Sequence, residues 1–99
     1  MTKMQNWRLR GCISVLLDQN DKLTTMSQNY ANANLPNIML KNIRDNLEIA
    51  VALLDQVGHI NIDAEISDEY IARLRHSIGD LAVSVAMTEI QINEYRKRA

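Results

Sequence analysis

Few side chains of this 99-residue chain are placed to do chemistry, and the most obvious pair is Cys12 with His76. A cysteine becomes a nucleophile when a nearby base such as histidine takes its proton. Cys12 falls on the apolar side of the first helical segment, whereas His76 falls opposite the apolar side of the last. We therefore expect a buried thiol and an imidazole that faces away from it, with a catalytic role for neither.

A second set of possible ligands lies in the short connecting segment 59–66, where His59, Asp63 and Glu65 alternate with apolar residues. Zinc sites usually combine Cys and His at tighter recurrent spacings, and a calcium loop places acidic residues around a glycine. Neither pattern is present, so we expect a solvated polar rim above inward-facing isoleucines. The sequence predicts no metal and no other cofactor.

The carboxylates are scattered over the outer sides of the helical segments: Asp18, Asp21, Asp45, Glu48 and Asp55. General acid–base catalysis needs a pair of such groups in a dry cleft that shifts one pKa. Nothing in the sequence indicates such a cleft, and no glycine-rich phosphate-binding loop is present. We predict that the protein is not an enzyme and has no small-molecule substrate.

A basic group is the one other candidate, and it consists of residues from two distant segments: Trp7, Arg8, Arg10, Arg73 and Arg75. If the first and last helices run parallel, these residues share one end of the molecule, where Trp7 could stack on a base. The net charge of −1 and the pI of about 6.1 argue against strong phosphate binding. Weak nucleic-acid binding is therefore an alternative function, and two solvated helix ends are the simpler interpretation.

The elements that position these residues are three helical segments, at about 6–30, 37–57 and 67–97. Each carries apolar residues at alternating steps of three and four, the spacing of a helix packed on other helices. The last has the clearest seam: Ile71, Leu74, Ile78, Leu81, Val85, Thr88, Ile92 and Tyr95. The first has Leu9, Cys12, Leu16, Gln19, Leu23, Met26 and Tyr30, and the second has Leu40, Ile43, Leu47, Ala50, Leu54 and Val57. We predict one all-α domain over 1–99, an antiparallel up-down-up bundle of three helices.

Local signals set the expected ends of these helices. Asn6 is a plausible N-cap of the first helix, Asn34 or Leu35 of the second, and Ser67 of the third. Gly58 favours a left-handed stop at the end of the second helix. The weak helix formers after residue 20 predict that the second half of the first helix bends or frays.

Apolar residues outside the seams are the feature with most bearing on function: Val83, Met87 and Ile90 in the last helix, with Ile49 and Leu53 in the second. A helix that is apolar on several sides needs neighbours on several sides, and three helices give each only two. A bent first helix or the isoleucine connector is the alternative cover for these residues. We predict a non-enzymatic protein that acts by protein–protein interaction as an adaptor, chaperone or inhibitor, and that forms a homodimer.

Cysteine count and hydropathy are the features of the sequence that bear on its compartment. The single cysteine cannot form an intramolecular disulfide. No stretch approaches the roughly 20 apolar residues of a membrane span. We expect a cytoplasmic protein that does not enter a membrane.

Overall fold

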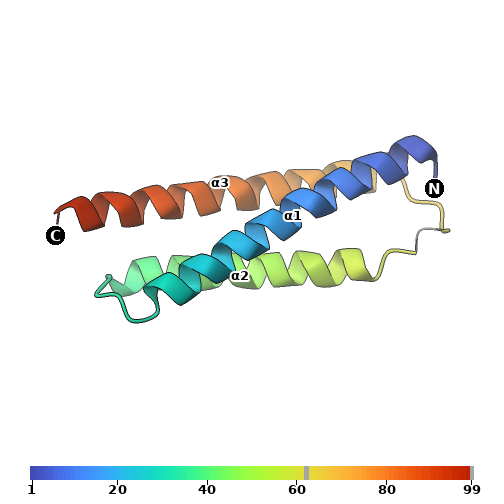
Figure 1. Cartoon of the computed structure of the whole chain (residues 1–99). Coiled ribbons are helices and arrows are strands. Elements are labelled where there is room, and N and C mark those ends of the chain that lie inside the picture. Colours follow the sequence, from blue (N-terminus) through green and yellow to red (C-terminus); the bar gives the residue numbers. More distant parts are fainter. Residues whose placement is uncertain (62, 99) are drawn as a thin grey trace.

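The computed structural model describes residues 1–61 and 63–98, and it contains three helices that all pack against one another (Figure 1). They are α1 (Lys3–Tyr30), α2 (Asn37–Gly58) and α3 (Asp68–Arg98). The predicted all-α three-helix bundle is confirmed. The bounds differ from the predicted ones by one residue or none, except that α1 begins three residues earlier.

The direction of the helices follows from contacts near their ends. Near the beginnings of α1 and α3, the Gln5 amide donates to a carboxylate oxygen of Asp68 over 2.9 Å. Near their ends, the Arg96 guanidinium lies 5.4 Å from the centre of the Tyr30 ring. These two helices therefore run the same way, α2 runs in the opposite direction, and α1 crosses diagonally from α3 to α2 (Figure 1). The result is a rod of 52 × 18 × 16 Å, in which much of each helix lies at the surface.

The seams predicted for the first and third helices form the core. From α1 the buried residues are Leu9, Cys12, Leu16, Leu23 and Met26, and from α3 they are Ile71, Leu74, Ile78, Leu81, Val85, Thr88 and Ile92. Gln19, Tyr30 and Tyr95 are half-buried at the edges of these seams. The core is therefore almost wholly aliphatic, as expected of helices packed through Leu, Ile and Val.

The buried side of α2 differs from the predicted seam. Leu53, which was expected outside the seam, is buried. Its buried residues are Ile43, Asn46, Ala50 and Leu53, while Leu40, Leu47, Leu54 and Val57 are half-buried against the core. The reason is that α2 packs on two helices, so its buried side is wider than a single line of residues. Leu53 lies two turns after Asn46 and belongs to this buried side.

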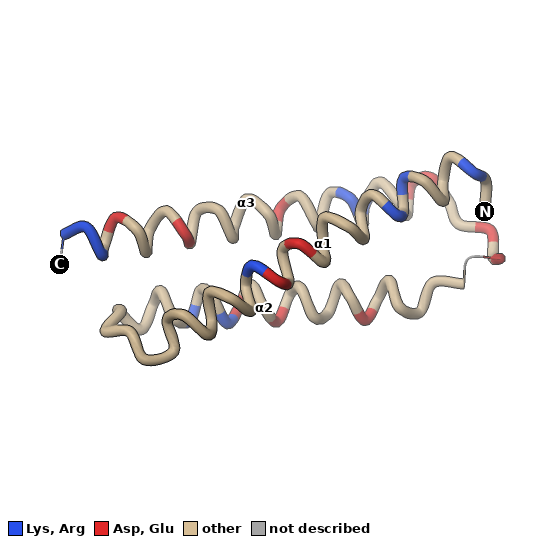
Figure 2. Tube along the Cα trace, viewed as in Figure 1, with Lys and Arg blue, Asp and Glu red and all other residues tan. Residues whose placement is uncertain are grey.

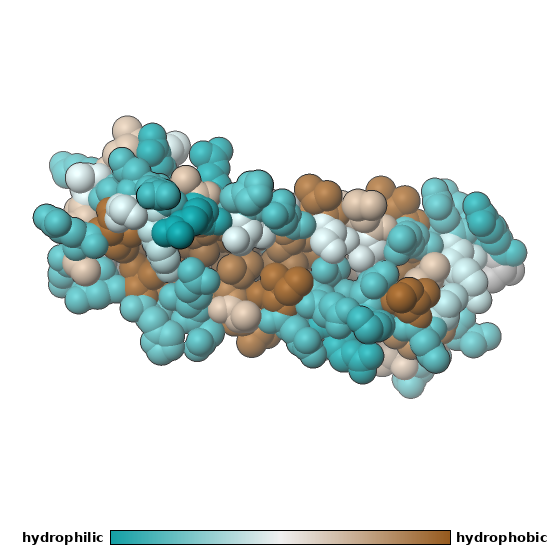
Figure 3. All heavy atoms as spheres, turned by 180° about the vertical axis from the view of Figure 1, so that it is seen from behind, coloured by the Kyte–Doolittle hydropathy of each residue, from teal (hydrophilic) through white to brown (hydrophobic). Residues whose placement is uncertain are grey.

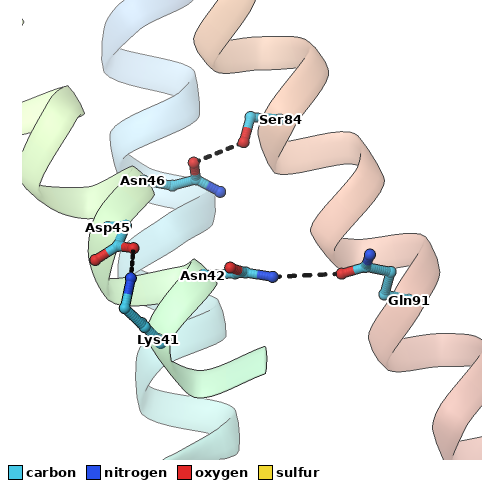
Figure 4. A network of polar contacts seen from close by, with 6 residues as sticks. All are labelled: Lys41, Asn42, Asp45, Asn46, Ser84 and Gln91. Atoms are coloured by element: carbon cyan, nitrogen blue, oxygen red, sulfur yellow. Dashed lines mark hydrogen bonds and ion pairs between the residues drawn. The ribbon is translucent and has the colours of Figure 1, made fainter. Parts of the chain in front are cut away.

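Asn46 carries a polar network into the core between α2 and α3, where Figure 4 shows it pointing at α3. Its amide donates to the Thr88 hydroxyl over 3.2 Å, and its carbonyl accepts from the Ser84 hydroxyl over 2.8 Å. The Thr88 hydroxyl in turn donates to the backbone carbonyl of Ser84. Because buried polar groups are costly unless paired, this network favours one register of α2 against α3.

The first helix begins at Lys3 because of a capping box that the prediction of Asn6 missed. The Thr2 hydroxyl accepts from the backbone N–H of Gln5, and the Gln5 side chain accepts from that of Thr2, both over 3.1 Å. The Gln5 amide also donates to the Ile66 carbonyl over 2.8 Å, which ties this end of α1 to the chain before α3. The helix then continues without a break to Tyr30, so the expected fraying is absent from it.

The other helix ends are a mixture of confirmed and corrected predictions. Ser67 does cap α3, with its hydroxyl accepting from the N–H of Tyr70 over 3.0 Å. Pro36, and neither Asn34 nor Leu35, is the N-cap of α2, because its ψ of 143° is extended and the helix begins only at Asn37. Gly58 is not left-handed; it is the last helical residue, and His59 closes α2 with a tightened turn.

The second connector covers one end of the rod only in part. Ile60 is half-buried and packs against the core, and Ile66 is also half-buried, whereas Ala64 is exposed. Ile62, the third isoleucine of the predicted strip, lies outside the described residues. The expected cover of the core is therefore confirmed for Ile60. None of the three described helices is apolar enough over a sufficient length to cross a membrane.

Candidate functional site

The strongest candidate site is an apolar strip on α3 that faces away from the core. Val83 is 60% exposed, Met87 59% and Ile90 56%. At 3.6 residues per turn these three positions lie opposite the buried seam of the same helix. We call them the α3 outer face. Neither the path of α1 nor the second connector covers it, so both alternatives considered for this strip are excluded by its exposure.

The two α2 residues expected to support this surface differ in their exposure to solvent. Ile49 is 48% exposed and lies one turn after Asn46, on the edge of α2 nearest α3. Leu53 is only 8% exposed and lies in the core, so the structure removes it from the candidate surface. The candidate partner-binding set is therefore the α3 outer face with Ile49 at its margin.

The space-filling view shows how this surface is distributed. Seen from behind in Figure 3, hydrophobic groups lie along the upper edge, which α3 forms, and across the middle of the face. Polar groups surround them. Monomeric proteins rarely leave large contiguous apolar patches in water, and a patch rimmed by polar residues is typical of an interaction site. The rod shape explains why three helices alone cannot hide these residues.

A groove of about 650 Å³ between α1 and α3 gathers most of the predicted basic group. Trp7, Arg8, Arg10 and Arg75 all line it, above an apolar floor that includes Ile78. None of these three arginines belongs to an ion pair among residues 1–61 and 63–98. The groove thus combines unpaired positive charge with one exposed aromatic ring, which is a chemistry suited to anions.

Arg73 is the exception in that group. It does not line the groove, because it lies two residues before Arg75 and so points about 200° away around α3. Figure 2 shows Lys and Arg gathered near the beginnings of α1 and α3, with a second basic group at the end of α3. The shared end expected for the basic residues is therefore present, but Arg73 faces another side of it.

Cys12 and His76 do not form a catalytic site. Cys12 is buried, as predicted, and is part of the core cluster. The His76 side chain is exposed and lies 3.5 Å from a carboxylate oxygen of Asp80, one turn along the same helix. Thiol and imidazole therefore occupy the inside and the outside of the bundle respectively, and the imidazole cannot serve as the base for this cysteine.

The remaining polar candidates do not converge either. Among the residues the structure describes, no three His, Cys, Asp or Glu side chains come close enough to hold a metal ion. Asp63 and Glu65 are exposed, and His59 lies 3.4 Å from Asp55. Of the other predicted carboxylates, Asp45 pairs with Lys41 over 2.6 Å, and Asp18, Asp21 and Glu48 are exposed.

The sequence interpretation missed several exposed apolar residues: Met4, Val15, Leu17, Ile38 and Val51. The signal was available, since each lies off the seam of its helix. It also missed Gly79, which lies in α3 between the basic groove and the α3 outer face. Comparison with protein-family models, curated proteins and solved structures gives no match.

Proposed function

We propose that this protein works without catalysis, as a small interaction protein of the adaptor, chaperone or inhibitor type that forms a homodimer through the α3 outer face. The observation that carries the proposal is the position of Val83, Met87 and Ile90. Each leaves more than half of an apolar side chain in water, on the side of α3 that no other helix of the bundle touches.

Exposure of these three apolar side chains to water costs free energy that a partner surface would recover. Full burial of a Val, Ile or Met side chain stabilises by about 1.5–3 kcal/mol, so covering the exposed half of each contributes about 1–2 kcal/mol. The same strip occurs on both copies in a symmetric dimer, which doubles that contribution. Ile49 at the margin adds to the apolar area.

The test replaces Met87 with glutamate and measures molar mass by light scattering at micromolar concentration. A charge at the centre of the strip opposes burial against a second copy, so Met87→Glu is expected to be monomeric where the unmodified protein is dimeric. Met4→Glu is the matched control, because Met4 is 57% exposed but lies on α1. An unchanged mass for Met87→Glu contradicts the use of this strip in self-association.

A second function, weak nucleic-acid binding, is supported by the groove that Trp7, Arg8, Arg10 and Arg75 line together. Stacking on the ring and neutralisation of phosphates by arginine are the expected contacts. A gel shift at low salt tests it, with Arg10→Glu in the groove and Arg44→Glu on α2 as the control. Absence of any shift for the unmodified protein rules this function out.

A further inference from the structure

We infer that the second copy lies along α3 in the antiparallel direction, with Val83 of the two copies facing each other. This inference rests on the proposed homodimer and specifies its geometry. Val83 is the midpoint of α3, since Asp68 lies 15 residues before it and Arg98 15 residues after it. Full overlap of two antiparallel copies of this helix therefore places Val83 against Val83, and it places Met87 and Ile90 of one copy against Gly79 and His76 of the other.

Charge along the exposed line of α3 determines the direction. Positions seven residues apart share one face of a packed helix. On the line through Val83 they are Glu69, His76, Val83, Ile90 and Lys97. The line is therefore acidic at its beginning, apolar at its centre and basic at its end.

Antiparallel pairing brings opposite charges together at both ends. Glu69 of one copy meets Lys97 of the other, and Asp68 meets Arg98. A parallel pair would place Glu69 beside the second Glu69 and Lys97 beside the second Lys97, which is repulsive. Neither Glu69 nor Lys97 has an ion-pair partner among the residues the structure describes. Antiparallel helix dipoles favour the same arrangement.

Arg73 gains a role in this geometry. When the pair of helices is centred on Val83, residue 93 of the second copy lies level with Arg73. Glu94 of the second copy is the next residue along. Both side chains are exposed within the described protomer, and neither belongs to an ion pair there. Arg73 lies about 80° around α3 from Val83, at the edge of this face, and its long side chain can extend from there towards Glu94 of the second copy.

Gly79 offers space to Met87 of the second copy when the pair is centred on Val83. Gly79 and Met87 lie four residues on either side of Val83, so Gly79 of one copy faces Met87 of the other. A Cβ atom built on Gly79 meets no atom within 4 Å, so the space above this glycine is open in the protomer. Methionine is long and flexible and fills irregular gaps. A large side chain therefore faces an open space in both halves of the contact.

Disulfide cross-linking tests this geometry on the full chain. Val83→Cys places two thiols at the centre of the antiparallel pair, where they are expected to link almost completely under mild oxidation. Ile90→Cys is the matched control, because residue 90 and its copy would lie about 21 Å apart along the helix axis. A disulfide needs Cα atoms within about 7 Å. The unmodified protein, whose only cysteine is buried, serves as the blank.

The outcomes separate the geometry from the proposed function. A dimeric mass with linked Val83→Cys and unlinked Ile90→Cys supports the inference. Equal linking of both variants indicates a parallel pair and overturns it, as does a dimeric mass without linking at Val83. A monomeric mass for the unmodified protein overturns the proposed homodimer as well.

A second variant tests the contact at the glycine independently. Gly79→Leu fills the space that Met87 of the second copy would occupy, and it is expected to weaken dimerisation at least tenfold. Gly11→Leu is the control, since Gly11 is also an exposed helical glycine with no atom within 4 Å of an added Cβ. Equal dimerisation of the two variants contradicts the inferred contact. Circular dichroism confirms that both variants remain helical.

Discussion

The buried amide of Asn46 gives the sharpest prediction about how the bundle is held in register. Asn46→Ala removes the two hydrogen bonds that join α2 to Ser84 and Thr88. Each is worth about 1 kcal/mol. The space left by the side chain costs about 1 kcal/mol more. The higher helix propensity of alanine offsets about 0.5 kcal/mol of this loss in stability. We expect a net loss of about 2–3 kcal/mol.

The matched control is Asn42→Ala, one turn earlier on the same helix. Asn42 also donates to a residue of α3, Gln91, but the bond is 3.5 Å long and exposed (Figure 4). Removing an exposed contact of this kind changes stability by about 0.5 kcal/mol or less. The pair of variants therefore isolates the effect of burial on the same type of side chain in the same helix.

Thermal unfolding followed by circular dichroism measures the difference, at one fixed protein concentration because association shifts the midpoint. A loss of 2–3 kcal/mol lowers Tm by roughly 10 °C or more in a domain of this size. Asn42→Ala is expected to lie within about 3 °C of the unmodified protein. Equal midpoints for the two variants would refute the claim that the Asn46 network stabilises the core.

Three further predictions concern the ends and the interior of α1. Thr2→Ala removes the capping box and is expected to cost about 1 kcal/mol in urea unfolding, whereas Thr25→Ala on the exposed side of the helix is neutral or slightly stabilising. Gln5→Glu keeps the acceptor for Thr2 but faces Asp68 with a like charge, so a loss of about 1 kcal/mol is expected; a neutral result contradicts that contact. Cys12, 7% exposed at the wall of the groove, is expected to react with a thiol reagent far more slowly than the exposed cysteine of Val83→Cys, and equal rates contradict its burial.

The fold was predictable because most of the apolar residues obey one period. In α1 and α3 the three-four spacing identifies the buried line from Leu9 to Met26 and from Ile71 to Ile92. In α2 the same reasoning selected Leu54 in place of Leu53, because the pattern contains enough leucine to support two neighbouring lines. Contact with two helices, which the pattern of one segment does not encode, decides between them.

The candidate surface was predictable only where position on a helix decides exposure. Val83, Met87 and Ile90 lie opposite a clear seam, and their exposure follows from that geometry. The buried role of Asn46 was not predictable, since a lone asparagine in a helix is usually exposed and its partners lie about 40 residues away. Arg73 shares an end of the rod with the other basic residues but faces another side, and a shared end does not determine which side a residue faces.

The central claim is that the α3 outer face is covered by a second copy of the chain. Sedimentation equilibrium of the unmodified protein over a range of micromolar concentrations tests it most directly. The weight-average mass is expected to rise with concentration towards twice the 11.3 kDa of one chain. A mass that stays at 11.3 kDa throughout that range would contradict it.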